Sequence, residues 1–207
     1  MDQTVILVFN LAVLILSVVI HEVSHGLMAN RLGDPTAKDL GRLSFNPLKH
    51  LDFMGSFLVP LLLYVSRVGI IFGWAKPVPY NPYNLKNQKW GPALVAAAGP
   101  VSNFIIALFF GLVLRFVPAI PFATALAVSV IVYINILLGV FNLVPIPPLD
   151  GSKILAGFLP YRYERQLLML ERWGMFLVIL FIFFLFPLLS PVIPFMFRFI
   201  TGSSFMF

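Results

Sequence analysis

The stretch TVILVFNLAVLILSVVIHEVSH, residues 4–25, decides the fold of this chain, because it joins a long apolar run directly to a cluster of ionisable side chains. Residues 4–20 contain no charged side chain, and the helical pattern continues to Arg31. A transmembrane helix needs about 20 mainly apolar residues. The sequence therefore predicts a membrane-spanning helix over residues 4–31, with the ionisable cluster near its second end.

The cluster contains two histidines four residues apart, His21 and His25, which places both imidazoles on one face of a helix. Two histidines at this spacing can hold one zinc ion, and Glu22 projects roughly 100° away around the helix, beside such an ion. A carboxylate there can act as a general base, and the H-E-x-x-H pattern is typical of metal-dependent peptidases. Ionisable groups are costly inside a membrane, so this cluster favours a functional site over a packing role.

The composition restricts the class of protein. Of the 207 residues, 60% are hydrophobic and 11% are charged, which predicts an all-α polytopic membrane protein in a single domain, residues 1–207, with about four to six membrane-embedded segments. The chain has no cysteine, so a zinc ion would be held by histidine and carboxylate. The net charge of +6 comes from basic residues spread over short loops, which favours contact with a lipid bilayer and not with nucleic acid.

Basic residues also predict how the chain lies in the membrane. Loops 31–50 and 74–91 carry four and three Lys or Arg residues, residues 147–172 carry four, and residues 1–20 carry none. If all three basic segments face the cytoplasm of a prokaryotic cell, the apolar residues 53–73 cannot cross the membrane and must be re-entrant, shielded by surrounding protein. The alternative is an ordinary span with loop 74–91 outside.

Three further apolar runs are expected to span the membrane: residues 92–116, 124–146 and about 173–190. The second of these runs into a proline-rich end that unwinds the helix just before Asp150. An aspartate at this point is either the N-cap of the segment from Ser152 or a metal ligand.

The predicted topology favours the ligand interpretation of Asp150. It emerges on the same cytoplasmic side as His21 and His25, so the three side chains can meet. Two histidines and one carboxylate leave the fourth position of a tetrahedral zinc site open for water, which is the pattern of catalytic and not of structural zinc. The sequence therefore places a candidate active site towards the cytoplasmic face.

Five segments together resemble the site-2 protease family of zinc-dependent intramembrane metalloproteases, in a small form without a PDZ or other soluble regulatory domain. They are, in chain order, HEVSH at 21–25, GRLSFNPLKH at 41–50, GWAKPVPYNP at 73–82, AAAGPVSNFIIA at 96–107 and NLVPIPPLDG at 142–151. The resemblance implies a core of three helices and a small membrane-associated sheet formed by the two Asn-Pro loops. That core would be formed by 4–31, 92–116 and 124–146.

The resemblance also implies an activity and a set of site residues. The activity is hydrolysis of a peptide bond in or near the transmembrane segment of a single-span substrate, as in regulated intramembrane proteolysis. Homo-oligomerisation is left open. The implied roles are zinc ligands for His21, His25 and Asp150, catalytic base for Glu22, and substrate or oxyanion contacts for Asn103 and Asn142.

Two alternatives remain at this stage. A membrane transporter or a proton- or metal-coupled channel could use the same His, Glu and Asp residues, because such groups also mark ion pathways. Asn103 could serve helix packing, since it follows a run of small residues, 96–99, that permits close approach of helices. A substrate strand could also pair with an exposed edge at 41–50 or 76–82.

Overall fold

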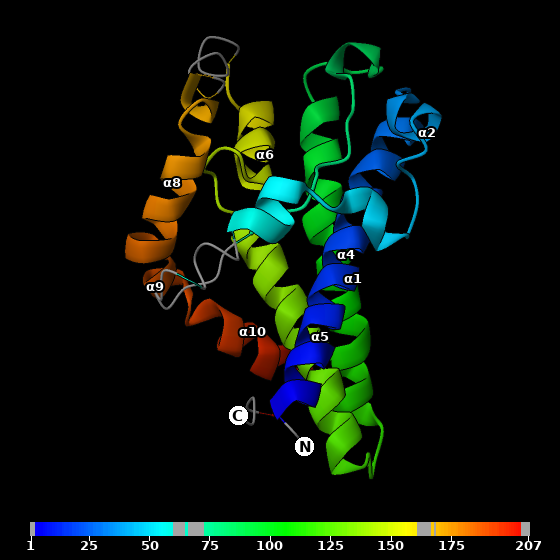
Figure 1. Ribbon diagram of the computed structural model, residues 1–207, viewed down its shortest axis with the longest axis vertical. Coiled ribbons are helices and arrows are strands. Elements are labelled where there is room, and N and C mark those ends of the chain that lie inside the picture. Colours follow the sequence, from blue (N-terminus) through cyan, green and yellow to red (C-terminus); the bar gives the residue numbers. More distant parts are fainter. Residues whose placement is uncertain (1–2, 60–64, 66–72, 161–166, 168, 204–207) are drawn as a thin grey trace.

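The computed structural model describes residues 3–59, 65, 73–160, 167 and 169–203 of the chain, and all regular secondary structure in these residues is helical (Figure 1). Helices α1 (Gln3–Arg31), α4 (Gly91–Phe116) and α5 (Phe122–Asn142) are each long and apolar enough to cross a membrane. A fourth candidate is a bent pair of helical segments near the C-terminus. The predicted class, an all-α polytopic membrane protein, is confirmed.

The ends of the spans follow the proline pattern. Helices α1 and α4 agree with the predicted ranges to within one residue, whereas α5 ends at Asn142 and not at the predicted 146. Residues 143–149 form turns instead, because the prolines at 145, 147 and 148 cannot donate helical hydrogen bonds. The chain becomes helical again in α6 (Asp150–Phe158).

The predicted last span, 173–190, is broken into α8 (Gly174–Leu180), the π-helical turn η4 (Phe181–Leu185) and α9 (Phe186–Leu189). Pro187 has no N–H to offer to the carbonyl group four residues earlier, and a π-type bond from the Phe186 N–H to the Phe181 oxygen precedes it. Helix α10 (Val192–Thr201) then leaves at an angle of 51°.

Helix α4 lies at the centre, in contact with α1, α5, α6 and α10 (Figure 1). A buried cluster joins α4, α5 and α10 through Ala107, Val132, Ile136, Ile193 and Phe197. A second cluster packs Val144 and Leu149 against Val178 and Phe181, so α8 and η4 support the turn that precedes Asp150. The second cluster therefore holds in place the turn from which Asp150 follows.

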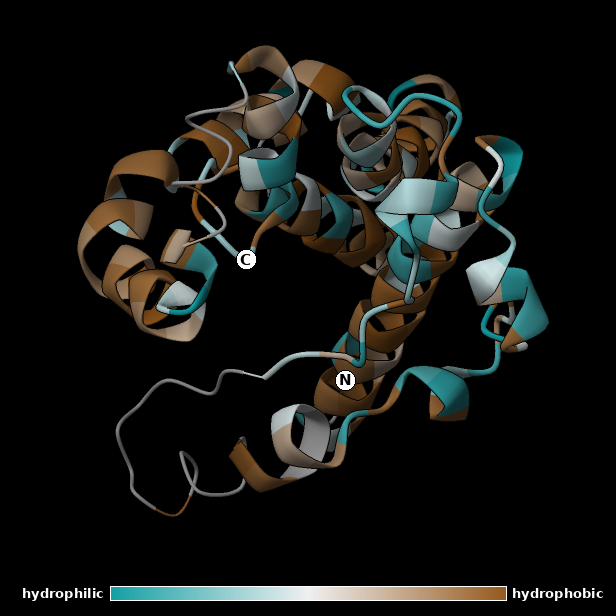
Figure 2. Ribbon diagram, turned by 90° about the horizontal axis from the view of Figure 1, so that it is seen from above, coloured by the Kyte–Doolittle hydropathy of each residue, from teal (hydrophilic) through white to brown (hydrophobic). Residues whose placement is uncertain are grey.

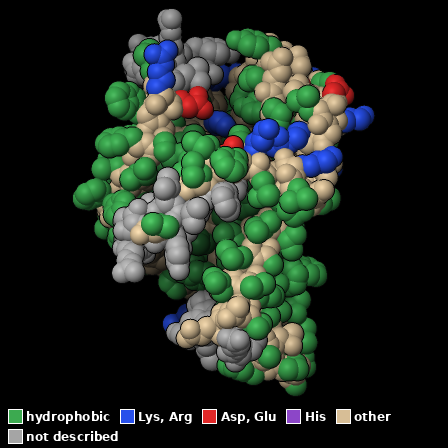
Figure 3. Space-filling model, in the orientation of Figure 1, with side chains coloured by type: hydrophobic (Ala, Val, Ile, Leu, Met, Phe, Trp, Pro, Cys, Tyr) green, Lys and Arg blue, Asp and Glu red, His purple; other side chains and the backbone are tan. Residues whose placement is uncertain are grey.

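Hydrophobic and charged residues separate along the molecule. Seen from above, the long helices are mainly hydrophobic and the connecting segments mainly hydrophilic (Figure 2). Almost all charged side chains on the face shown in Figure 3 gather near its upper end, while hydrophobic side chains cover the lower part. The exposed apolar residues, such as Leu7 and Phe109, are those expected to contact lipid.

The two basic loops, 31–50 and 74–91, lie at the same end of the bundle. The Lys86 N–H donates to the Leu32 oxygen at 2.9 Å, and the Arg42 guanidinium donates to the Lys76 oxygen at 3.0 Å. This shared position agrees with the predicted placement of both loops on one side of the membrane.

The prediction of a re-entrant segment over 53–73 concerns mostly residues 60–64 and 66–72, which lie outside the described residues. The segment begins with the π-helical turn η2 (Phe53–Leu58). Its two ends meet, because the Trp74 N–H donates to the Gly55 oxygen at 3.1 Å and the Lys76 N–H donates to the His50 oxygen at 2.8 Å. The segment therefore starts and finishes at the same level of the bundle.

The small sheet implied by the family resemblance is not formed by residues 41–50 or 73–82, all of which the structure describes. Both loops are extended and end in 3-10 turns, η1 (Pro47–His50) and η3 (Pro82–Asn84), each capped by the preceding asparagine. Pro77 and Pro79 deprive the second segment of ladder donors, which disfavours its pairing as a strand. The Asn-Pro phrases are capped turns instead.

Single-cysteine labelling can test the predicted orientation, because the chain has no native cysteine. We expect Gln88→Cys in the loop before α4 to resist an impermeant thiol reagent in intact cells and to react after permeabilisation. Thr124→Cys, at the opposite end, is the control and should react from outside. Reaction of Gln88→Cys in intact cells would place the basic loops outside and contradict the charge argument.

Candidate metal centre

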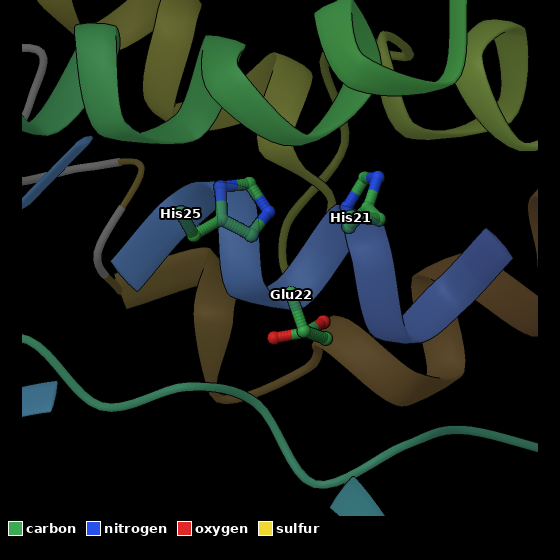
Figure 4. A group of neighbouring side chains, drawn as sticks. All are labelled: His21, Glu22 and His25. Atoms are coloured by element: carbon green, nitrogen blue, oxygen red, sulfur yellow. The ribbon is translucent and has the colours of Figure 1, made fainter. Parts of the chain in front are cut away.

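The predicted metal ligands come from two elements that meet beside α4. His21 and His25 lie in the second half of α1 and point towards α4, whereas Glu22 projects from the other side of the helix (Figure 4). Asp150 is the first residue of α6. The His21 and Asp150 side chains are nearly buried, with 6% and 8% of their residue surface exposed.

The three predicted ligands converge on one point. The Nε2 atoms of His21 and His25 lie 3.1 and 3.3 Å from the same oxygen, Oδ2 of Asp150. Leu149, not Asp150, occupies the N-cap position of α6, and the Asp150 carboxylate faces the imidazoles. The capping interpretation of Asp150 is therefore wrong, and its position fits the ligand interpretation.

The other ring nitrogens define where the imidazole protons lie. His21 Nδ1 is 2.6 Å from the Asn103 Oδ1, and His25 Nδ1 is 2.7 Å from the Val95 carbonyl oxygen. The Asn103 amide orientation is consistent, because its Nδ2 donates to the Asn135 Oδ1 at 2.9 Å. Both Nδ1 atoms are thus donors, and in neutral imidazoles both Nε2 atoms carry a bare lone pair.

This arrangement fits a bound zinc ion. Two Nε2 lone pairs and a carboxylate oxygen face one another, and they would repel unless a cation lay between them. Protonating both imidazoles would instead place two positive charges on rings whose centroids are 4.6 Å apart in a nearly buried site. In a tetrahedral site with bonds of about 2.0–2.1 Å the ligand atoms are about 3.3 Å apart, close to the observed separations.

Glu22 lies close to this ligand set. One of its carboxylate oxygens and one nitrogen of each histidine all lie within 4.8 Å of one another, which suits a base beside the ion. Its Oε2 accepts a hydrogen bond from the Val78 N–H at 2.8 Å. The predicted division of roles between Glu22 and the three ligands therefore agrees with the geometry.

The close approach of the rings to α4 depends on Gly99. A Cβ atom at this position would lie 2.5 Å from His25 Cε1 and 2.6 Å from His21 Cε1, which no packing could accommodate. The predicted run of small residues in α4 thus makes room for the imidazoles. The close packing of α1 against α4 at Gly99 is therefore part of the metal site.

Electrostatics keep Asp150 ionised. Burial by itself would raise the pKa of this carboxyl, but a positive charge beside it, either a bound cation or protonated imidazoles of His21 and His25, outweighs burial and lowers the pKa. Its place in the first turn of α6 also favours a negative charge there. The carboxylate is therefore available as a ligand at neutral pH.

The structure gives Asn103 a different contact from the predicted one. Its side chain is fully buried, is bonded to His21, and does not line the cavity beside the metal centre. Its Nδ2 bonds to Asn135 of α5, which donates in turn to the Ser17 Oγ of α1 at 2.9 Å. Asn103 thus contacts a histidine in this structure, and its predicted contact with substrate stays a prediction.

Sequence reasoning missed Asn135 and Ser17. Ser17 precedes His21 by four residues and lies on the same helix face, and Asn135 is a carboxamide within a span, so both gave a signal. Their pairing could not be read from the sequence, because it depends on how α1, α4 and α5 pack together.

A cavity of about 140 Å³ opens beside the candidate ligands. Its wall includes Glu22 and Asn142, together with Tyr80 and Lys153, which the sequence did not single out. Asn142 donates to the Leu138 oxygen at 3.0 Å, and its predicted contact with substrate stays a prediction. Burial and then the charges of Asp150 and Glu171 raise the pKa of Tyr80 to about 12, so its hydroxyl remains a hydrogen-bond donor.

Comparison with known proteins matches the model for peptidase family M50 to residues 119–186. YwhC of Bacillus subtilis (strain 168), whose name describes a zinc metalloprotease, is 38% identical over 188 residues, which cover 87% of this chain and 81% of YwhC. Rip2 of Mycolicibacterium smegmatis, with a similar name, is 30% identical over 80% of this chain, and the match spans 62% of Rip2. Rip2 of Mycobacterium tuberculosis (strain H37Rv) is 27% identical over 85% of this chain and 66% of its own length. No solved structure matches the chain.

We expect Asp150→Ala to lower zinc affinity strongly, because two histidines alone leave the ion under-coordinated. The loss should exceed the roughly 10–100-fold that removal of an outer partner of a ligand causes. Zinc competition with a chelator measures it, and Asp39→Ala, an exposed aspartate on α2 (Thr36–Asp39), is the matched control. Unchanged zinc affinity would remove Asp150 from the ligand set.

Asn103→Ala should act through His21. It leaves the His21 Nδ1–H and the Asn135 carboxamide without their partner, which costs about 1–3 kcal/mol of unfolding free energy. We also expect zinc affinity to fall by about 10–100-fold. Ser102→Ala, next to it on α4, removes only a hydroxyl bonded to its own helix and is the control. Normal zinc affinity in Asn103→Ala, with only substrate cleavage impaired, would restore the substrate-contact interpretation.

Proposed function

Because this chain belongs to peptidase family M50, the site-2 protease family, and is a zinc-dependent protease built on membrane-length helices, we propose that it cleaves its substrates within or beside their transmembrane segments. The position of the metal centre is the observation that supports this. His21 and His25 lie inside α1, roughly 9–15 Å along the helix axis from Arg31. A peptide bond at that depth belongs to a membrane-embedded substrate.

The chemistry divides among four residues. His21, His25 and Asp150 would hold the zinc ion, which when bound would acidify a water molecule and polarise the scissile carbonyl group. Glu22 takes the proton of the attacking water, while the water oxygen forms the new bond to the carbonyl carbon. When the C–N bond breaks, Glu22 passes this proton to the leaving nitrogen, so the carboxylate is regenerated.

The conformation of the substrate bears on how its peptide bond reaches the metal centre. A helix holds its carbonyl groups in internal hydrogen bonds, so the scissile segment must be unwound before cleavage. An unwound backbone needs hydrogen-bond partners inside a membrane. Asn142 and Tyr80 in the cavity wall can supply a carboxamide and a hydroxyl to it.

The edge of 76–82 is less suited to pairing with a substrate strand than the sequence suggested. Its N–H groups at Lys76, Val78 and Asn81 already donate to His50, Glu22 and Asp34. We therefore favour recognition by the cavity wall over addition of a strand to this segment.

The side of the membrane follows from charge. The metal centre is nearer the end of the bundle that carries both basic loops, and basic loops favour the cytoplasm. We propose that cleavage occurs in the cytoplasmic part of a single-span substrate, which would release a fragment into the cell as in regulated intramembrane proteolysis. A transporter would use the same groups as an ion path, but the relatives of this chain are named as metalloproteases.

The test is cleavage of a single-span reporter, a protein whose apolar helix is interrupted by Asn-Gly in its cytoplasmic part. We expect purified wild-type protein in detergent to cut it, and Glu22→Gln to lower the cleavage rate by at least about 100-fold with zinc content unchanged, because the base is lost and the ligands remain. Cleavage at the wild-type rate by Glu22→Gln would exclude Glu22 as the base. Failure of the wild type to cut any helix-broken reporter would contradict the proposed activity.

A further inference from the structure

An extended segment, residues 73–81, crosses α1 on the side from which Glu22 projects (Figure 4). We call this segment the strap. The Arg42 guanidinium donates to the Lys76 and Pro77 oxygens at 3.0 and 3.3 Å, and the Lys76 N–H donates to His50. The first half of the strap is therefore held by the preceding loop.

The second half of the strap is held by Asp34, just beyond the end of α1. Its fully buried carboxylate accepts from the Asn81 N–H at 2.6 Å, from the Asn84 side chain at 2.9 Å and from Thr36. Burial opposes the charge of Asp34, but these hydrogen bonds outweigh it and lower its pKa. The strap is thus tied to the helix that carries the catalytic motif.

At the centre of the strap, the tripeptide 77–79 has one backbone donor. Pro77 and Pro79 have no N–H, so the Val78 N–H is the only one in the tripeptide, and it bonds to the Glu22 Oε2 at 2.8 Å. The Val78 side chain, 6% exposed, seats against Gly26, one turn beyond Glu22. A Cβ at Gly26 would lie 2.5 Å from Leu43 Cδ2 and 2.9 Å from Val78 Cγ1, so the missing side chain makes room for both Val78 and Leu43.

We propose that the Val78 N–H is a positioning group for the catalytic base, an inference that rests on the proposed role of Glu22. A glutamate on a helix has three side-chain torsions, and fixing them costs about 1.5–2 kcal/mol. A rigid backbone donor on one carboxylate oxygen supplies that restraint and leaves the other oxygen to take the proton. Glu22 still lines the cavity with the strap in place, so the contact orients the base and does not cover it.

Two substitutions separate the N–H from the side chain. Val78→Pro removes the donor in a segment that already carries a proline on either side, and Val78→Ala keeps the donor but shortens the side chain. With the single-span reporter in detergent, we expect Val78→Pro to lower kcat by about 100-fold, with KM and zinc content near those of the wild type. Val78→Ala should lose about threefold at most.

Two results would overturn the proposal: equal kcat values for the proline and alanine variants, or a higher kcat for Val78→Pro. The second would identify the strap as an inhibitory lid. If Val78→Pro does not fold, Gly26→Ala is the replacement, because its methyl group displaces Val78 without touching a ligand. Its kcat should fall, and adding Val78→Ala together with Leu43→Ala should restore it by removing both contacted methyl groups; no recovery would count against the proposal.

A measurement without substrate keeps this inference distinct from the proposed activity. We expect the Val78 amide, observed in valine-labelled protein by NMR, to exchange slowly with solvent in the wild type. It should exchange at least tenfold faster in Glu22→Ala, whereas Asp39→Ala, remote from the strap, should leave it unchanged. Equal exchange in wild type and Glu22→Ala would show that the contact does not form, even if the reporter is cleaved normally. Slow exchange in a protein that cuts no reporter would leave the contact intact and count against the activity alone.

Discussion

The meeting of three lone-pair donors at one point is the constraint on which the rest of the structure depends. Two imidazole Nε2 atoms lie 3.1 and 3.3 Å from one carboxylate oxygen, and a cation bound between them would make that arrangement favourable. Helix α4 supplies acceptors from Val95 and Asn103 to the two Nδ1 atoms, which favours the tautomers with unprotonated Nε2 atoms. Elements α8 and η4 pack against the turn before Asp150. The metal site is therefore a property of the whole bundle.

Burial in a membrane domain explains why the polar side chains around the metal centre have hydrogen-bond partners. A polar group without a partner costs several kcal/mol where water is absent, so each functional side chain must bring its own supporting group. Asn103, Asn135 and Ser17 form such a chain across three helices, and each of the donors named above reaches an acceptor. Such a network gives rigidity only when it is fully satisfied, which is the case for these residues.

The sequence predicted the parts of the site that follow from local periodicity. His21, Glu22 and His25 needed only the helical repeat, and Asp150 needed only the order of spans and loop charges. The contact of Asn103 with His21 could not be foreseen, because a carboxamide's partner is set by the packing of three helices. The early end of α5 follows from prolines that withdraw backbone donors, and Pro77 and Pro79 withdraw donors from the second Asn-Pro loop in the same way.

The histidines and Glu22 lie on two different faces of α1 and therefore need different neighbouring segments to orient them. Because His21 and Glu22 are adjacent, their side chains point about 100° apart, so no single neighbouring helix can orient both. Helix α4 orients the histidines and leaves the base to whatever lies on the other face. A helix placed there would have its own N–H groups bonded internally and could offer only side chains. An extended, proline-flanked segment presents one free backbone donor at a fixed position, and it does so where Gly26 lets it lie close to α1. The irregular strap is therefore suited to this position because its backbone is not paired with itself.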